Sequence, residues 1–262
     1  MYVCGDSWLS PSIRLPNTHF SEIISKKLNY DLIAFSRGGM SNGGICIQIE
    51  SAIKRNADFM LINTTSAERF EIPIKEEFKI DTDFDVTDIV YANKEYLSSF
   101  NKEINQNPRI ISDCIKLFFM EDPDDKNDDY WGSNRYRKFD KNIDKKKMII
   151  KYYFEHLYNS SWKEKLDQMC LYATLHKLHL SGIPYLLILD QLNINNTLSW
   201  ITEKNVLLDW ADFNKRASKN LRESNNFIWK DPGYHSLPQD QEYAANEILN
   251  HIKKYDLLTK GK

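Results

Sequence analysis

Residues 1–7 read MYVCGDS, an apolar run that leads directly into a small turn and a serine. The side chains of residues 2–4 favour a short buried strand, and the Gly5-Asp6 pair permits a tight turn. A serine in this place has two interpretations. Ser7 either caps the helix that follows or is a nucleophile held at the edge of a sheet. The rest of the sequence decides between them.

The chain then alternates between helical and strand patterns. Apolar side chains at helical spacing predict helices over residues 19–28 and from Asn42 to about Arg55, with Asn42 as the N-cap. Apolar runs predict strands over residues 31–35 and 58–63. This β-α-β-α-β order is typical of a parallel sheet that is covered by helices on both faces.

The same alternation returns in the last part of the chain. Residues 148–180 predict one long helix, or two helices broken near 159–161, and Gly182 supplies a left-handed cap at its end. The run PYLLILD at 184–190 predicts a fourth buried strand, and residues 238–253 predict a final amphipathic helix. These elements extend the sheet domain that the first part of the chain predicts.

Residues 72–147 interrupt the alternation. Periodicity fades there and charge rises, as in EDPDDKNDD at 121–129. The acidic residues lack the glycine turn and the spacing of a calcium loop, which favours a solvated surface over a metal site. We therefore predict a single domain over 1–262, with a mostly helical insertion at about 72–147.

The composition argues against several classes of protein. A formal net charge of -2 is unlike that of a dedicated nucleic-acid-binding protein. No apolar run approaches the roughly 20 residues of a membrane span, and no basic segment followed by an apolar one indicates a signal peptide. The four cysteines are scattered without a CxxC pair, as is typical of free thiols in a reducing compartment. The sequence therefore predicts a cytoplasmic protein.

Polar segments follow the predicted strands, and one more precedes the last helix. They are GDSW at 5–8, SRGGMSN at 36–42, NTTS at 63–66 and DPGYH at 231–235. The carboxyl ends of parallel strands meet at one edge of a sheet, so these segments are predicted to converge. A nucleophilic serine needs a base, a group that orients the base, and N–H donors for the oxyanion. The four segments contain residues for each of these roles.

In order and placement, these segments resemble the sequence blocks of the SGNH, or GDSL, hydrolase family. The resemblance covers roughly residues 1–70 and 180–255, and the insertion lies outside it. It implies a flavodoxin-like three-layer α/β/α sandwich with a short parallel sheet. It also implies a serine esterase or acylhydrolase that uses a Ser-His-Asp triad and requires no metal or cofactor.

The resemblance also implies a role for individual residues. Ser7 is the nucleophile, His235 is the base and Asp231 orients the base. The backbone N–H groups of Ser7 and Gly39 form part of the oxyanion hole, with Gly38 as an alternative to Gly39. The non-catalytic alternatives are that Ser7 caps a helix and that His235 lies on the surface.

Two departures from the family pattern affect these assignments. The third block normally reads G-x-N-D, whereas this chain has NTTS at 63–66. Thr65 aligns with the family's oxyanion asparagine and has a hydroxyl that can donate, and Asn63 is the alternative donor. Asp231 precedes His235 by four residues instead of three. Either the Pro-Gly turn between them absorbs the extra residue, or serine and histidine act as a dyad.

Five residues are candidates for substrate binding: Trp8, Arg37, Asn42, Arg69 and Tyr234. The two aromatic residues stack on a sugar ring or pack an acyl group, or they only close the sheet edge. The two arginines bind an anionic substrate group or form ordinary ion pairs. By family analogy we expect a small acyl ester as substrate, with an acetylated carbohydrate as the leading candidate. A catalytically inactive binding or structural protein of this fold, and a lipid-directed esterase or thioesterase, remain as alternatives.

Overall fold

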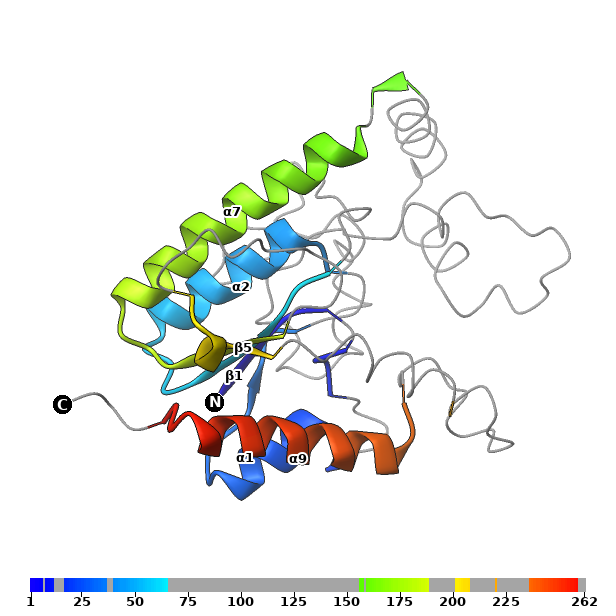
Figure 1. Ribbon diagram of the computed structural model, residues 1–262, viewed down its shortest axis with the longest axis vertical. Coiled ribbons are helices and arrows are strands. Elements are labelled where there is room, and N and C mark those ends of the chain that lie inside the picture. The colour runs from blue at the N-terminus through cyan, green and yellow to red at the C-terminus, as the bar shows by residue number, and fades with distance from the viewer. Residues whose placement is uncertain are drawn as a thin grey trace, which may run out of the picture.

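The computed structural model describes residues 1–6, 8–11, 17–36, 40–65, 156–157, 159–188, 201–207, 220 and 236–258. These segments form a five-stranded parallel sheet between two pairs of helices (Figure 1). The predicted α/β class with a parallel sheet is therefore confirmed. The predicted insertion at 72–147 lies outside the described residues.

The strands are β1 (Tyr2–Cys4), β2 (Ile33–Ala34), β3 (Met60–Asn63), β4 (Tyr185–Ile188) and β5 (Val206–Leu207). Within the described residues they lie in the order β2-β1-β3-β4-β5, and every neighbouring pair is parallel. Cys4 at the end of β1 pairs with Ile62, so β3 continues one residue further, to Asn63. The chain therefore leaves β1 and β3 side by side, at the same edge of the sheet.

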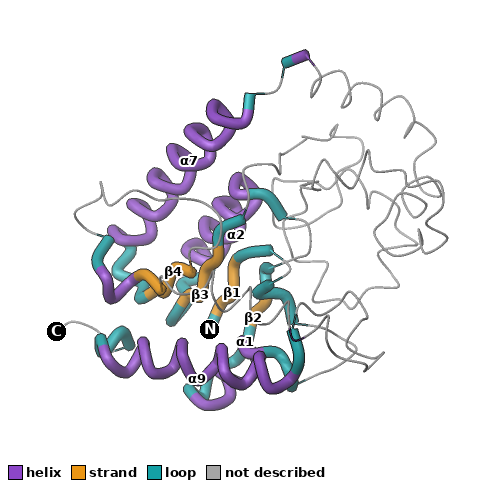
Figure 2. The backbone as a smooth tube through the Cα atoms, turned by 45° about the vertical axis from the view of Figure 1, so that its right-hand side comes forward, coloured by secondary structure: helices purple, strands orange, loops and turns teal. Residues whose placement is uncertain are grey.

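The helices are α1 (Phe20–Lys27), α2 (Asn42–Lys54), α7 (Ser160–Leu180) and α9 (Pro238–Lys254), and a short 3-10 helix, η3 (Glu203–Asn205), precedes β5. Helices α2 and α7 pack together on one face of the sheet, and α1 and α9 pack together on the other (Figure 2). Successive side chains of a strand point to opposite faces, which gives each pair of helices its own core. In β3, Met60 and Ile62 join the core under α2 and α7, and Leu61 joins the core under α1 and α9.

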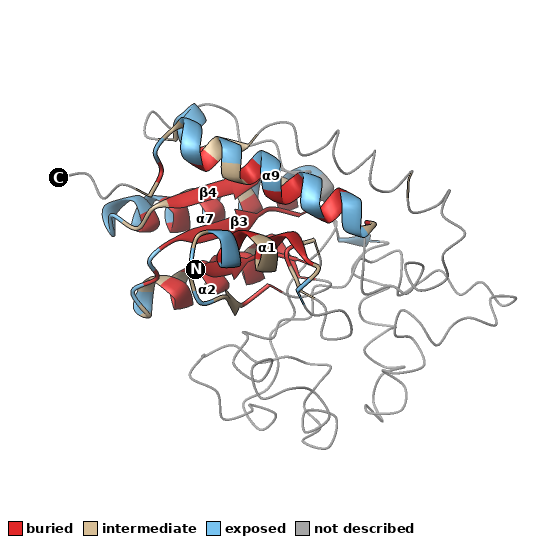
Figure 3. Cartoon of the chain, turned by 90° about the horizontal axis from the view of Figure 1, so that it is seen from below, coloured by how far each residue is buried: buried red, intermediate tan, exposed pale blue. Residues whose placement is uncertain are grey.

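Burial follows directly from this layering. Every residue of β3 and β4 is buried, as expected for strands that are covered on both faces. Helix α9 is buried on its inner side, at Ala244, Ala245 and Ile248, and exposed on its outer side (Figure 3). Among the described helices, none combines the length and the apolar character that a membrane crossing requires.

The start of α2 differs from the prediction by one residue. Ser41 is the N-cap, because its backbone is extended and its hydroxyl accepts a hydrogen bond from the Gly44 N–H at 3.3 Å. Asn42, the predicted cap, is the first helical residue. A serine and an asparagine are about equally good caps, so the sequence alone did not separate the two positions.

Both ends of α7 are defined by side-chain or backbone features. Asn159 is its N-cap and accepts a hydrogen bond from the Trp162 N–H at 2.9 Å. Helix α7 therefore begins at the position near 159–161 where the sequence allowed a break between two helices. Gly182 follows the helix with φ of 69°, the left-handed conformation that was predicted for it.

The hydroxyl of Tyr185 is buried at the start of β4 and has no hydrogen-bond partner among the described groups. Burial raises the pKa of Tyr185 to about 12. Tyr185→Phe is therefore expected to raise the free energy of unfolding by about 1 kcal/mol, because it removes an unsatisfied polar group. Urea unfolding monitored by circular dichroism measures the change.

The pH dependence gives a second check on the same variant. The folded-state pKa lies above the unfolded value, so the wild-type protein loses stability between about pH 10 and 12, and Tyr185→Phe does not share that loss. Tyr255→Phe is the control, since its hydroxyl is exposed and donates to Glu203 at 3.4 Å. A clear loss of stability in Tyr185→Phe at neutral pH would show that its hydroxyl is satisfied.

Candidate functional site

Asp6 lies two residues beyond the end of β1, and only 1% of its surface is exposed. Its Oδ1 accepts hydrogen bonds from the Trp8 N–H at 3.0 Å and from Asn63 Nδ2 at 2.8 Å. Its Oδ2 accepts from the Thr65 hydroxyl at 3.0 Å, and its own N–H donates to Asn63 Oδ1 at 3.0 Å. A buried carboxylate needs such donors to offset its lost hydration. Together these bonds fix the backbone on both sides of position 7.

Gly5 precedes this carboxylate and leaves no room for a side chain. A Cβ at this position would lie 1.6 Å from Asn63 Oδ1 and 3.0 Å from Leu9 Cδ1. The Gly5 N–H donates to Gln48 Oε1 at 2.5 Å, which ties the end of β1 to α2. The glycine is therefore required because the Asn63 carboxamide lies directly against its Cα.

The two candidate oxyanion donors, Asn63 and Thr65, are both buried and both bonded to protein groups. Asn63 Nδ2 donates to Asp6 Oδ1 at 2.8 Å and to the Thr64 carbonyl at 3.0 Å, which uses both of its hydrogens. The single hydroxyl hydrogen of Thr65 goes to Asp6 Oδ2. For either side chain to donate to an oxyanion, one of these bonds has to open. The choice of oxyanion donor therefore stays a prediction.

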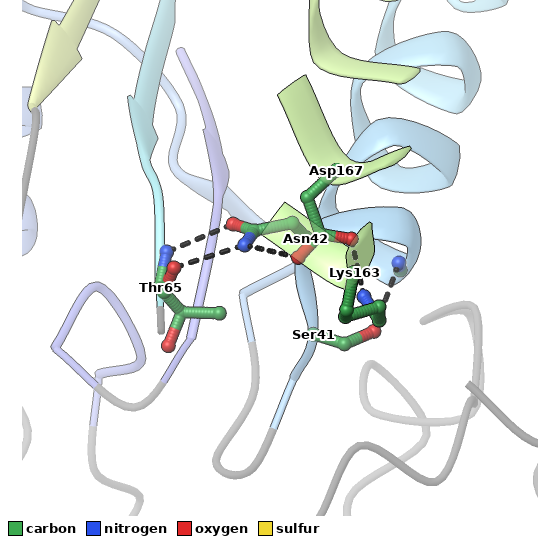
Figure 4. Close-up of polar contacts among 6 residues, drawn as sticks. Ser41, Asn42, Thr65, Lys163 and Asp167 are labelled. Carbon is green, nitrogen blue, oxygen red and sulfur yellow. Dashed lines mark hydrogen bonds and ion pairs between the residues drawn. The ribbon is translucent and has the colours of Figure 1, made fainter. Parts of the chain in front are cut away.

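Asn42 joins the start of α2 to the end of β3 and to α7 (Figure 4). Its Oδ1 accepts from the Thr65 N–H at 2.9 Å, and its Nδ2 donates to the Thr65 carbonyl at 2.9 Å. The same Nδ2 donates to Asp167 Oδ2 at 3.0 Å, and Asp167 Oδ1 pairs with the Lys163 ammonium. Asn42 is fully buried, and both ends of its carboxamide bond to these protein groups. Its role in substrate binding stays a prediction.

His19 links Trp8, the residue after position 7, to the start of α1. Its Nε2 lies 3.0 Å from the Trp8 carbonyl, which accepts hydrogen bonds and cannot donate them. The ring is therefore protonated at Nε2, and its Nδ1 accepts from the Ser21 N–H at 3.2 Å as the cap of α1. Glu22 completes the cap by accepting from the His19 N–H at 3.0 Å.

Gln241 links the start of α1 to the start of α9. Its Oε1 accepts from the Phe20 N–H at 2.8 Å, and its Nε2 donates to the Ser236 hydroxyl at 2.7 Å. Both Gln241 and Ser236 are buried. The residue that follows His235 in sequence is thus anchored at the N-terminus of α1, next to His19.

The remaining predicted site residues lie outside the described residues: Ser7, Arg37, Gly38, Gly39, Arg69, Asp231, Tyr234 and His235. Of the described ones, Asn63 and Thr65 bond to Asp6 at the carboxyl ends of β1 and β3, and Asn42 bonds to the backbone of Thr65. Trp8 is half-buried against the core under α1 and α9. Its N–H donates to Asp6 Oδ1, and its carbonyl lies 3.0 Å from His19 Nε2.

Sequence reasoning missed the residues that support this cluster from the helices: Gln48, Lys163, Asp167, His19 and Gln241. A Lys and an Asp four residues apart usually form a solvated pair on a helix surface, so their spacing carried no signal of burial. The one available signal was the capping pattern of His19 followed three residues later by Glu22.

Comparison with protein-family models, with curated proteins and with solved structures gives no match to this chain. Among the described residues, no three His, Cys, Asp or Glu side chains gather in a way that would hold a metal ion.

Proposed function

We propose that the protein is a serine esterase of the SGNH type, with Ser7 as nucleophile, His235 as base and Asp231 as the residue that orients the base. The order of the four polar segments along the chain supports this assignment, as does the parallel sheet. The bonds that Asp6 makes support it further, because they hold the backbone on both sides of Ser7 rigid. A nucleophile at a strand end requires such a fixed turn.

One observation carries the pairing of Ser7 with His235. Trp8, the residue after Ser7, bonds through its carbonyl to His19. Phe20, the next residue along, donates to Gln241, which in turn donates to Ser236, the residue after His235. Three hydrogen bonds at the starts of α1 and α9 thus connect the sequence neighbours of the two proposed catalytic residues.

The proposed reaction is acyl transfer to Ser7 followed by hydrolysis. His235 removes the hydroxyl proton of Ser7 while the oxygen attacks the ester carbonyl, and the backbone N–H groups of Ser7 and Gly39 stabilise the oxyanion. His235 then protonates the leaving alcohol as the C–O bond breaks. Water attacks the acyl-enzyme in the same way, which releases the acid and restores the serine. Thr65 or Asn63 joins the oxyanion hole only after releasing one of its present hydrogen bonds.

The proposed substrate is a small acyl ester, with an acetylated carbohydrate as the leading candidate. Trp8 follows the proposed nucleophile in sequence, and Tyr234 precedes the proposed base. Both aromatic side chains are suited to packing against a sugar ring or an acyl group. Arg37 and Arg69 are suited to an anionic group on the substrate. The proposed Ser-His-Asp triad requires no metal or cofactor.

Hydrolysis of p-nitrophenyl acetate by the full chain tests the proposal. Turnover is expected to rise through about pH 6 to 7.5, because a histidine base must be neutral to accept a proton. His235→Gln is expected to abolish this rise together with most of the activity. A flat profile in a rate limited by chemistry would contradict the role of His235.

A series of p-nitrophenyl esters of increasing chain length separates the proposal from its main enzymatic alternative. We expect acetate to be preferred, whereas a preference for chains of about eight carbons or more would identify a lipid-directed esterase or thioesterase. Hydrolysis that Ser7→Ala does not reduce would exclude both.

An inactive binding or structural protein is the second candidate, and one specific observation favours it. The side-chain donors of Asn63 and Thr65 are both engaged within the protein, so neither of the two predicted side-chain donors is free for an oxyanion. Losing one oxyanion donor costs about 100- to 1,000-fold in kcat. A slow enzyme is compatible with this geometry, and complete inactivity of the folded wild type would select the second candidate.

A further inference from the structure

Lys163 and Asp167 form an ion pair on the side of α7 that packs against α2. The two residues are 9% and 3% exposed, and the ammonium donates directly to Asp167 Oδ1. Moving two charges out of water is costly, and apolar residues of similar volume often leave a protein equally or more stable. Stability alone therefore does not account for this pair.

The second oxygen of Asp167 connects the pair to the candidate site. Asp167 Oδ2 accepts from Asn42 Nδ2, and Asn42 is the first residue of α2, where a negative charge is favourable. The rest of the Asn42 carboxamide bonds to both the N–H and the carbonyl of Thr65 (Figure 4). One carboxylate on α7 thus orients a side chain that clamps the backbone just beyond β3.

The Thr65 side chain connects this segment to the turn beyond β1. The Thr65 hydroxyl donates to Asp6 Oδ2, and Asp6 immediately precedes Ser7 in sequence. Another ion pair among the described residues joins Lys177 of α7 to Glu50 of α2 at 3.3 Å, and it is about half exposed. The exposed pair serves as a matched reference for the buried one.

We propose that Asp167 is a positioning residue of the site, with Lys163 as the counter-ion that allows its carboxylate to be buried beside Asn42. Through Asn42, Asp167 holds the end of β3 and the turn after β1 in the geometry that the serine requires. Neither residue contacts substrate. The effect on turnover rests on the proposed esterase function, whereas the effect on the backbone at Thr65 does not.

Three double variants test the proposal. K163M/D167L removes both charges and the acceptor for Asn42, and K163M/D167N removes the charges but keeps an amide oxygen that can accept from Asn42. K177M/E50L removes the exposed pair and is the control. For p-nitrophenyl acetate, K163M/D167L is expected to lose about 10- to 100-fold in kcat with little change in KM. K163M/D167N is expected to recover most of that loss, and the control is expected to match wild type.

Amide hydrogen exchange at Thr65, followed by NMR, gives a readout that does not depend on activity. Its N–H bonds to Asn42 Oδ1, so exchange is expected to be at least about tenfold faster in K163M/D167L and unchanged in the control. The amide of Leu61, inside β3, is the internal reference. Should K163M/D167L not fold, K163M/D167A takes its place in every comparison.

The possible outcomes are distinct. Faster exchange at Thr65 in K163M/D167L, in a protein whose wild type shows no turnover, would support the positioning role and reject the esterase. Wild-type turnover that K163M/D167L retains in full, with Thr65 still protected, would overturn the positioning role and leave the esterase standing. A kcat loss that K163M/D167N does not recover would show that charge, and not the bond to Asn42, is what matters, which also contradicts the proposal.

Discussion

Replacing Ser7 by alanine is expected to lower kcat for ester hydrolysis at least about a thousandfold, with little effect on the free energy of unfolding. The loss corresponds to about 4 kcal/mol of activation free energy. Alanine removes the attacking oxygen but keeps the backbone N–H, so the oxyanion hole is left in place. The steady-state rate with p-nitrophenyl acetate measures the effect, and urea unfolding shows that the variant is folded.

Ser10→Ala is the matched control, because Ser10 is a partly buried serine three residues further along the same segment. It is expected to retain full activity. If Ser7→Ala kept more than about a tenth of the wild-type rate, the barrier would have changed by less than about 1.4 kcal/mol and Ser7 would not be the nucleophile.

Gly5→Ala is expected to lower the free energy of unfolding by about 3 to 5 kcal/mol. The new Cβ would lie 1.6 Å from Asn63 Oδ1, so the Asn63 side chain has to move away. That movement breaks its bonds to the Asp6 N–H and carboxylate, which are both buried. Urea unfolding followed by circular dichroism measures the change.

Gly182→Ala is the control for the general cost of losing a glycine. Gly182 has a positive φ of 69°, but a Cβ added there would meet no described atom within 4 Å, so its replacement is expected to cost only about 1 kcal/mol. In a double-mutant cycle, Gly5→Ala is expected to add little to Asn63→Ala, because the clash is then gone. Equal costs at Gly5 and Gly182, or full additivity with Asn63→Ala, would contradict the close contact.

The layered fold was predictable because its central strands, β1, β3 and β4, are buried. Such strands are continuous apolar runs, and Met60–Asn63 and Tyr185–Ile188 both lie within the runs that the sequence marked. Strand β5 was not predicted, since Val206–Leu207 is too short to show any period. Its pairing with β4 is a tertiary contact that no local pattern encodes.

The candidate site was predictable in its location but not in its internal bonds. Parallel strands bring their carboxyl ends together, which places Asp6, Asn63 and Thr65 at one edge. The sequence did not reveal that Asp6 would take up the donors of both other side chains. It also did not reveal that Asp167, on a distant helix, would orient Asn42. Such bonds depend on how α7 packs on α2, which is a property of the whole fold.

If Ser7 is an activated nucleophile, it is expected to react with a fluorophosphonate probe. A fluorophosphonate phosphonylates a serine whose proton is taken by a nearby base, with loss of fluoride, so it reports activation without a known substrate. Intact-mass measurement followed by peptide mapping locates the adduct. We expect one adduct per chain, on Ser7, which is lost in His235→Gln and retained in Ser10→Ala. A folded wild-type protein that forms no adduct, or forms it on another residue while Ser7 stays unmodified, would contradict the account.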